Sequence, residues 1–283
     1  MDPEKFNEKI EKKVRNTIIE YNLIDPGDKI AVALSGGKDS VLTLQMLHRL
    51  QNDFDFEIFA ISIDEGIGGY RENGIVLAEK FAQKLNVNFI KKSFKEELGF
   101  SLDDISDEYK SACIPCGVFR RYLLNKTAYD EGAVKIATGH NLDDEIQSFL
   151  MSFARADLIK FYKFGPKLDL IHPKLIPRIK PLWNVLEKEV GLWAVLNSIE
   201  VHFAECPYSS RSLRSKIKNF LNEFESKRPG TKISIINSFK KSFKFEKQHI
   251  ILLECENCGE PSSANICKAC EMIKNIKIDY NLK

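Results

Sequence analysis

The sequence predicts an α/β fold, in which helices wrap a parallel sheet, followed by a small C-terminal module that is held together by a metal ion. Three observations predict it. Short apolar runs alternate with helical stretches, polar loops follow several of these runs, and four cysteines stand in two C-x-x-C pairs near the C-terminus. A chain of 283 residues is long enough for one large domain with an appendage.

Composition and charge exclude some classes of protein. No run approaches the roughly 18 apolar residues of a membrane span. The first residues, MDPEKFNEKIEKKVRN, lack the apolar core of a signal peptide. We therefore expect a cytoplasmic protein without a membrane partner. Because cytoplasmic thiols are kept reduced, metal binding is a better expectation than disulfides for its seven cysteines.

The first elements are a helix and then a strand-turn-helix unit. An amphipathic helix is expected over residues 4–22, where isoleucines and a valine share one side. A Pro-Gly pair breaks the chain after it. The apolar run 29–34 suits a strand buried on both faces of a parallel sheet. A glycine-rich turn at 35–40 leads into the helical run 41–50.

The alternation of strand and helix then repeats. The further expected strands are 56–63, 87–91 and 134–137, and the further expected helices are 75–85, 120–131, 143–154, 187–199 and 209–225. Prolines make residues 155–182 rich in loops. Such alternation implies right-handed crossovers between parallel strands, with ligands bound beyond the carboxyl ends of the strands.

The turn Ser35-Gly-Gly-Lys-Asp-Ser40 is the first candidate binding site. Its glycines allow a close approach to an anion, and unpaired amides at a helix start point toward one. Lys38 adds positive charge, and Asp39 could contact a metal ion held by phosphates. The pattern is not the Walker loop. It resembles the PP-loop of the N-type ATP pyrophosphatases, which cleave ATP between its α and β phosphates.

Two more segments fit this resemblance. Residues 61–66 (ISIDEG) follow the second strand, where this class places adenosine contacts, and residues 138–145 (TGHNLDDE) follow a later strand. Asp143 and Asp144 could hold Mg²⁺, or they could simply complement the dipole of the helix that they begin. The expected ATP contacts are Ala33, Ser35, Gly36, Gly37, Lys38, Asp39, Ser40, Ile63, Asp64, Gly139 and His140.

Three cysteines form a second candidate site. Cys113 and Cys116 are a C-x-x-C pair before a predicted helix, and Cys206 follows far along the chain. Such a pair can be a redox dithiol, half of a zinc site, or two ligands of an iron–sulfur cluster, and the nearby Arg120 and Arg121 favour thiolates. Spacing alone does not bring Cys206 to the pair. A structural turn with an inert, buried Cys206 is the alternative.

The last cysteines are Cys255, Cys258, Cys267 and Cys270, with the spacing C-x₂-C-x₈-C-x₂-C. Four thiolates in two knuckles suit a closed, tetrahedral Zn²⁺ site. Because this module is short, it has little hydrophobic core, and the metal ion must supply much of its folding energy. The segment before these cysteines is rich in lysine and arginine, with ten cations between residues 211 and 244. Such a segment could bind RNA, or it could be the solvated face of a helix. The ten cations are Arg211, Arg214, Lys216, Lys218, Lys227, Arg228, Lys232, Lys240, Lys241 and Lys244.

The motifs together resemble a known family. SGGKDS, SIDEGIGGYR, CIPCGVFRRYLLNK, TGHNLDDE, RIKPLW and ECPYSSRSLR are similar to stretches of the PP-loop tRNA 2-thiolation enzymes of the TtuA/NcsA type, and more distantly of TtcA. The resemblance spans roughly residues 28–275. It implies four parts: an N-terminal helix (1–27), a PP-loop ATP pyrophosphatase domain of the HUP-like class (28–205), a basic helical segment for tRNA (206–249) and a zinc-finger module or zinc ribbon (250–283).

The resemblance also implies roles for particular residues. A 4Fe–4S cluster on Cys113, Cys116 and Cys206 would keep one iron open for sulfide. Arg120 and Asp143 or Asp144 would be catalytic. Other members carry lysine at the position of Arg120, and a guanidinium suits phosphate or oxyanion stabilisation better than acid–base chemistry. Relatives usually also carry an N-terminal zinc finger, but residues 1–28 contain no cysteine, so either this branch lacks the finger or the chain is shortened.

The implied reaction is the adenylation of a tRNA uridine at its 2-oxygen by MgATP, followed by insertion of sulfur and loss of AMP. The wobble uridine is favoured slightly over the T-loop uridine. The sulfur donor would be sulfide or the thiocarboxylate of a ubiquitin-like carrier protein, and the resemblance implies a homodimer. The alternatives are persulfide chemistry on cytidine or uridine without a cluster, a PP-loop amide-forming ligase acting on a small molecule, and a non-catalytic zinc-ribbon RNA-binding protein.

Overall fold

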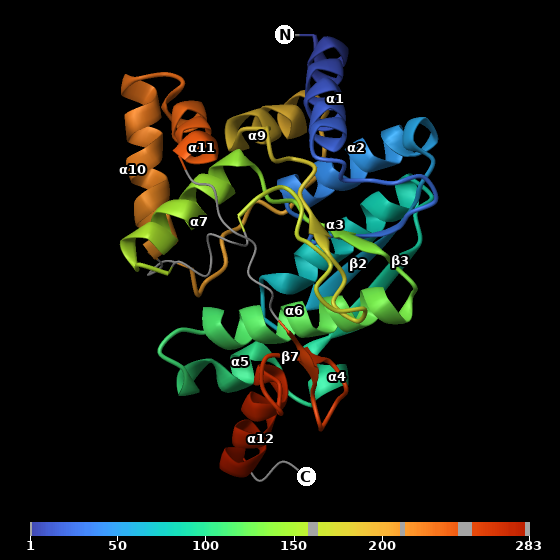
Figure 1. Cartoon of the computed structure of the whole chain (residues 1–283), viewed down its shortest axis with the longest axis vertical. Coiled ribbons are helices and arrows are strands. Elements are labelled where there is room, and N and C mark those ends of the chain that lie inside the picture. The colour runs from blue at the N-terminus through green and yellow to red at the C-terminus, as the bar shows by residue number, and fades with distance from the viewer. Residues whose placement is uncertain (1, 158–163, 210–212, 243–250, 281–283) are drawn as a thin grey trace.

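A parallel sheet forms the centre of the molecule (Figure 1). The computed structural model describes residues 2–157, 164–209, 213–242 and 251–280. Within these ranges the sheet has five strands in the order β3-β2-β1-β4-β5, and all neighbours are parallel. The strands are β1 Lys29–Ala33, β2 Glu57–Asp64, β3 Phe89–Ser93, β4 Lys135–Ala137 and β5 Arg178–Ile179. The predicted parallel α/β fold is therefore confirmed.

Helices cover both faces of this sheet. On one face lie α1 (Pro3–Glu20), α2 (Lys38–Phe54), α3 (Arg71–Lys84) and α9 (Glu187–Leu196). On the other lie α4 (Phe94–Leu98), α5 (Leu102–Ile105), the short 3₁₀ helix Ser106–Glu108 and α6 (Cys113–Asp130). In β1, Ile30 and Val32 are buried toward the first set and Ala31 toward the second. Burial on both faces explains why this strand is apolar at every central position.

Two smaller assemblies complete the described chain. Helices α7 (Leu142–Ala154), α10 (Leu213–Lys227) and α11 (Thr231–Ser242) group together on one side in Figure 1 and share a buried cluster around Ile146, Leu221 and Ile236. The C-terminal module pairs β6 (Leu253–Glu254) antiparallel to β7 (Pro261–Ser262) and ends in α12 (Lys268–Tyr280). Helix α12 packs on α6, with Met272 and Ile276 buried.

Some elements differ from the sequence prediction. Helix α6 begins at Cys113 rather than near residue 120, because Pro115 sits in its first turn, where a missing N–H removes no hydrogen bond. Helices α4 and α5 were not predicted, and serine side chains cap both of them. Helix α11, which follows the Pro-Gly break after α10, was not predicted either, because its sequence shows only a weak alternation of polar and apolar residues. No helix in the described ranges is long and apolar enough to cross a membrane.

Candidate functional site

The phosphate loop, Ser35–Ser40, connects the end of β1 to the start of α2. Because β1 lies between β2 and β4, the loops that follow these three strands share one edge of the sheet. The Ser40 hydroxyl donates to the Gly37 carbonyl (2.9 Å) and accepts from the Ser35 amide (3.1 Å). Ser40 is buried and Ser35 is exposed. The loop is therefore shaped by its own hydrogen bonds, and its outer side is accessible to a ligand.

Two glycines are required where this loop meets its neighbours. Gly36 has φ +83°, and a Cβ there would lie 2.0 Å from the Gly74 carbonyl oxygen of α3. A Cβ on Gly139, in the loop after β4, would lie 2.9 Å from the Ser40 nitrogen. The phosphate loop is thus in contact with the α3 backbone on one side and with the loop after β4 on the other. Gly139 therefore lies directly beside the loop.

Gly36→Ala is expected to destabilise the protein and to weaken ATP binding, whereas Gly27→Ala is a matched control. Gly27 has nearly the same φ (+82°), but nothing lies within 4 Å of the position of its Cβ. Both variants carry the left-handed backbone strain of about 1–2 kcal/mol, and only Gly36→Ala adds a backbone clash. Thermal unfolding and calorimetric ATP titration would test this. Equal effects of both variants would show that the contact with α3 is unimportant.

The charged residues of the loop are held by a second group of polar side chains. Lys38 Nζ lies 2.9 Å from Asp39 and 3.1 Å from Glu187 at the start of α9. Asn141 Nδ2 donates to Asp39 Oδ1 (2.8 Å). Burial would lower the pKa of Lys38, but the two carboxylates outweigh it and raise this pKa, so the ammonium is charged. Asp64, at the end of β2, pairs with Lys91 (3.3 Å), and the preceding Ile63 is buried.

Asp143 and Asp144 both begin α7, but their surroundings differ. Asp143 is buried, accepts the Glu187 amide (2.7 Å) and forms an ion pair with Lys232. Asp144 forms a capping box with Asn141 and pairs with Arg214 at 3.1 Å. Burial raises the pKa of Asp144 to about 6, although Arg214 opposes this shift. The Asp144 side chain is 29% exposed and that of Asp143 is 3% exposed, so only Asp144 is accessible to a ligand.

The structure brings Cys113, Cys116 and Cys206 together. Cys113 is the first residue of α6, Cys116 lies in the same turn, and the Cys113 sulfur is 4.0 Å from the carbonyl of Tyr208, near Cys206. Burial raises the pKa of Cys116 to about 11, Arg120 opposes this shift, and charges on Cys206 and Cys113 add to it. The three thiols are therefore close enough to interact electrostatically.

Cations and a neutral histidine line the same region. Arg120 is 53% exposed, and Arg178 has its pKa lowered to about 10 by burial and by Arg121 and Arg120. Desolvation and four nearby cations lower the pKa of His140 to about 3. His140 is therefore an uncharged imidazole at neutral pH, and its Nδ1 is hydrogen-bonded to the Thr138 hydroxyl (2.8 Å). The arrangement suits negatively charged ligands such as phosphates.

Sequence reasoning missed two buried charged residues, Glu65 and Arg71. Arg71 donates to the Ser35 carbonyl of the phosphate loop (2.7 Å) and pairs with Glu65 (2.7 Å). Glu65 also pairs with Arg120 (3.4 Å). Both residues stand in SIDEGIGGYR, and a glutamate next to a buried strand end was the available signal. Their burial could not be read from the sequence.

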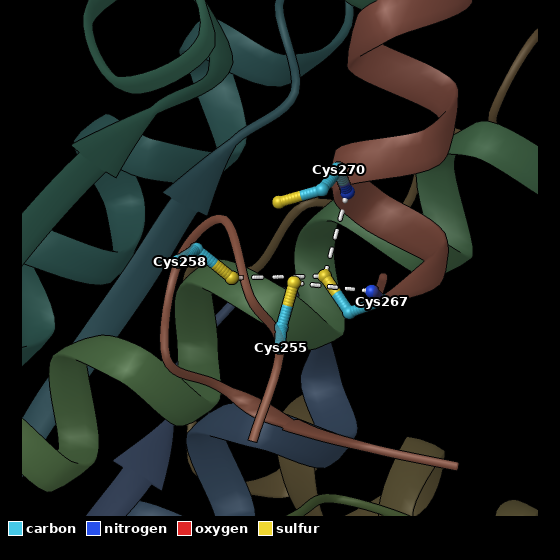
Figure 2. A group of neighbouring side chains, drawn as sticks. All are labelled: Cys255, Cys258, Cys267 and Cys270. Atoms are coloured by element: carbon cyan, nitrogen blue, oxygen red, sulfur yellow. Dashed lines mark hydrogen bonds between the residues drawn. The ribbon is translucent and has the colours of Figure 1, made fainter. Parts of the chain in front are cut away.

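The C-terminal cysteines form a compact group (Figure 2). The sulfur atoms of Cys255, Cys258, Cys267 and Cys270 all lie within 4.8 Å of one another. Burial opposes ionisation of Cys255, but amide N–H groups, first that of Cys267 (3.1 Å), outweigh it and lower the pKa of Cys255 to about 6. Four mutually close thiols with amide donors fit a tetrahedral Zn²⁺ site. Among the described residues, no other group of His, Cys, Asp and Glu is this compact.

The predicted basic segment turns part of its charge inward. Arg214 pairs with Asp144 (3.1 Å), Lys218 with Glu187 (2.8 Å), and Lys232 with Asp143. These cations attach α10 and α11 beside the phosphate loop. Five other cations of the segment, Lys216, Lys227, Arg228, Lys240 and Lys241, are exposed. Arg211 and Lys244 lie outside the described residues.

Comparison with known proteins gives consistent matches. Residues 4–224 match the family model of the PP-loop domain. The tRNA 2-thiolation protein NcsA of Haloferax volcanii is 35% identical over 96% of this chain and 92% of its own. The tRNA-5-methyluridine(54) 2-sulfurtransferase of Pyrococcus horikoshii is 36% identical over 99% of this chain and 89% of its own.

A solved structure is similar over nearly the whole fold. It is the U34-tRNA thiolase NcsA from Methanococcus maripaludis with its 4Fe–4S cluster. This protein is 34% identical to the present chain and superimposes with a TM-score of 0.82, covering 97% of this chain and 89% of its own. The likeness extends beyond the PP-loop domain.

Proposed function

This chain belongs to the family of PP-loop tRNA 2-thiolation enzymes, and from that premise we propose that it is an ATP-dependent tRNA 2-thiouridine synthetase. One observation carries the proposal: a PP-loop and a group of three cysteines are joined by a short chain of ion pairs. Arg71 contacts the phosphate loop, and Glu65 connects it to Arg120, one turn after Cys116. A PP-loop ligase for small molecules gives no reason for this second group.

In the proposed first step, ATP activates the base. The 2-oxygen of a uridine attacks the α-phosphate, and pyrophosphate leaves. Lys38 and the amides at the start of α2 stabilise the charge on the phosphates. Asp39 and Asp144 supply oxygen atoms for Mg²⁺, which prefers carboxylates and phosphates as ligands. Lys38 already has two carboxylate partners, so one of its three N–H donors remains for a phosphate oxygen.

In the proposed second step, sulfur replaces the adenylated oxygen and AMP leaves. Cys113, Cys116 and Cys206 offer only three sulfur ligands and do not form a compact group like the C-terminal four, so a 4Fe–4S cluster suits them better than a single ion. Cys113, Cys116 and Cys206 would hold the cluster, which would supply the site at which sulfide is bound and delivered. Arg120 offsets the negative charge of the thiolates and stabilises an oxyanion or phosphate beside them.

The finer features of the function are proposed as follows. We favour the wobble uridine, as in the Methanococcus enzyme, although the Pyrococcus relative acts on uridine 54 at a similar identity. The sulfur donor is sulfide or a carrier-protein thiocarboxylate, the C-terminal module binds Zn²⁺, and the active form is a homodimer. The reaction belongs in the cytoplasm, where free thiols persist.

A sulfur-transfer assay tests the proposal. Anaerobically reconstituted protein would receive ATP, sulfide and unmodified tRNA, and mass spectrometry would identify the digested nucleosides. We expect 2-thiouridine that depends on ATP, and fragment mapping would then locate the modified base. A cluster-loaded protein that binds ATP but leaves every tRNA unmodified, with sulfide or a thiocarboxylate as donor, would refute the proposed function.

The exposed cations of α10 and its C-terminal loop are expected to bind the tRNA backbone. Lys216 and Arg228 are both exposed. Replacing both by alanine should weaken tRNA binding and reduce the slope of log K against log salt by about 1 for each phosphate that is no longer neutralised. Lys12→Ala on α1, also exposed, is the matched control and should leave the slope unchanged. The same slope in all three proteins would place the tRNA on another surface.

A further inference from the structure

Arg71 is 7% exposed and stands at the first residue of α3. Its Nη1 donates to the Ser35 carbonyl in the phosphate loop (2.7 Å). Its Nε and Nη2 both donate to the Ile63 carbonyl (2.9 and 2.7 Å), and Nη2 also donates to the Ser62 hydroxyl (3.0 Å). A single guanidinium thus fastens the phosphate loop to the end of β2.

Glu65 is 4% exposed and links this guanidinium to the thiol group. One carboxylate oxygen lies 2.7 Å from Arg71 Nε, and the other lies 3.4 Å from Arg120 Nη1. Arg120 stands on α6 one turn after Cys116. The chain of contacts therefore runs without interruption from the phosphate loop to the residues beside the cysteines.

We propose that Glu65 and Arg71 are positioning residues, which hold the phosphate loop and Arg120 at a fixed separation so that the activated base lies within reach of the sulfur. The inference rests on the proposed function, because it assigns to these residues the alignment of its two half-reactions. Glu65 acts through Arg120, and Arg71 acts through the loop backbone. Transfer between two sites depends steeply on the alignment of the reacting atoms, so a small displacement of either site slows the reaction.

The physical basis is the burial of the charges. Glu65 and Arg71 are both buried, so each depends on the other, because an unpaired buried charge is strongly unfavourable. The half-exposed Arg120 joins this pair from the solvent side. The planar guanidinium of Arg71 makes contacts in several fixed directions, which a lysine cannot reproduce. The positions of Ser35, Glu65 and Arg120 are therefore coupled to one another rather than set independently.

A double-mutant cycle tests the Glu65 half of the proposal. Glu65→Gln keeps the shape of the side chain and leaves the hydrogen bonds of Arg71 to Ser35, Ser62 and Ile63 intact, but it removes the charge that pairs with Arg120. We expect Glu65→Gln and Arg120→Gln each to slow sulfur transfer at saturating ATP by about 10- to 100-fold. This is the loss of activity typically caused by mutating residues that support metal ligands. The double variant should be no slower than Arg120→Gln alone. Losses that multiply would overturn the coupling.

A spectroscopic measurement accompanies this cycle. The electron paramagnetic resonance spectrum of the reduced cluster should shift in Glu65→Gln at unchanged iron content, because Arg120 would move relative to the thiolates. An unchanged spectrum together with multiplying losses would leave Glu65 with a purely structural role and would overturn its positioning role.

Arg71→Lys tests the other half on cluster-free protein. Calorimetric titration with ATP should show binding weaker by about tenfold, because lysine keeps the charge but cannot make the same fork of hydrogen bonds. Unchanged ATP affinity would overturn this half. The measurement needs no thiolation, so it decides the role of Arg71 even where the wild-type protein makes no 2-thiouridine and the proposed function itself fails.

A matched control separates positioning from stability. Glu189 is another buried carboxylate (7% exposed), paired with Lys13 of α1 at 2.6 Å. Glu189→Gln should lower the thermal midpoint, as Glu65→Gln does, but it should change neither the ATP affinity nor the effect of Arg120→Gln. If Glu189→Gln reproduced these functional losses, reduced stability would explain them and the proposal would fail.

Discussion

Replacing Cys206 by serine is expected to abolish the formation of 2-thiouridine while leaving ATP binding intact. Cys206 lies in the loop after α9, which returns to the start of α6, where the Tyr208 carbonyl is 4.0 Å from the Cys113 sulfur. Serine retains the size of the side chain but is a poor ligand for iron. Mutating a residue that hydrogen-bonds to a metal ligand typically lowers metal affinity or activity by about 10- to 100-fold. Loss of a ligand itself should therefore reduce thiolation by at least about 100-fold.

The measurement is a single-turnover thiolation assay beside an ATP titration and an iron determination. Ser209→Ala is the matched control, because it removes only the hydroxyl that donates to the Cys206 carbonyl (2.7 Å). One such hydrogen bond contributes about 1 kcal/mol, so the thiolation rate of this control should fall by less than about tenfold. Full activity in Cys206→Ser would remove the third cysteine from the mechanism and favour chemistry on Cys113 and Cys116 alone.

Removal of zinc is expected to unfold the C-terminal module while the sheet stays folded. The module has two short strands and one helix, and its four cysteines lie together at its centre. Structural Zn²⁺ contributes on the order of 10 kcal/mol to the folding of zinc-finger peptides, which exceeds what so small a core supplies. Helix α12 should therefore lose its amide protection after chelation.

Hydrogen exchange read by mass spectrometry would measure this prediction. Peptides from α12 should exchange like an unfolded chain after chelation, whereas peptides from β1 and β2 should remain protected. Because Met272 and Ile276 pack in the same buried cluster as α6, protection at the outer face of α6 should also decrease. If α12 kept its protection in metal-free protein, the cysteines would not be a structural zinc site.

Much of the fold could be predicted because local patterns and tertiary burial agree. The apolar run of β1 is buried on both faces, and the phosphate loop follows it at the edge where the strands end. The four C-terminal cysteines could be grouped because two closely spaced C-x-x-C pairs bring their sulfur atoms within 4.8 Å of one another. In these segments the residues that determine the structure are neighbours in the sequence.

The remainder depends on contacts between distant residues. Cys206 comes near Cys113 and Cys116 only because the segment after α9 returns to the start of α6, where Tyr208 contacts Cys113, and no spacing rule encodes that path. Likewise, the basic pattern of α10 does not reveal that Arg214 and Lys218 point toward the acids at the starts of α7 and α9. Charge patterns show which residues are cationic, but only the fold shows which of them are already neutralised.

One carboxylate oxygen of Glu187 lies 3.1 Å from Lys38 and 2.8 Å from Lys218. When nucleotide phosphates attract Lys38, this oxygen is left to Lys218 alone, and the attraction between α9 and α10 increases. Occupancy of the proposed nucleotide site and anchoring of α10, the proposed tRNA-binding helix, would then be linked equilibria, and such linkage is reciprocal. A tRNA that draws Lys218 away would strengthen the hold of Glu187 on Lys38 and so favour release of the spent nucleotide.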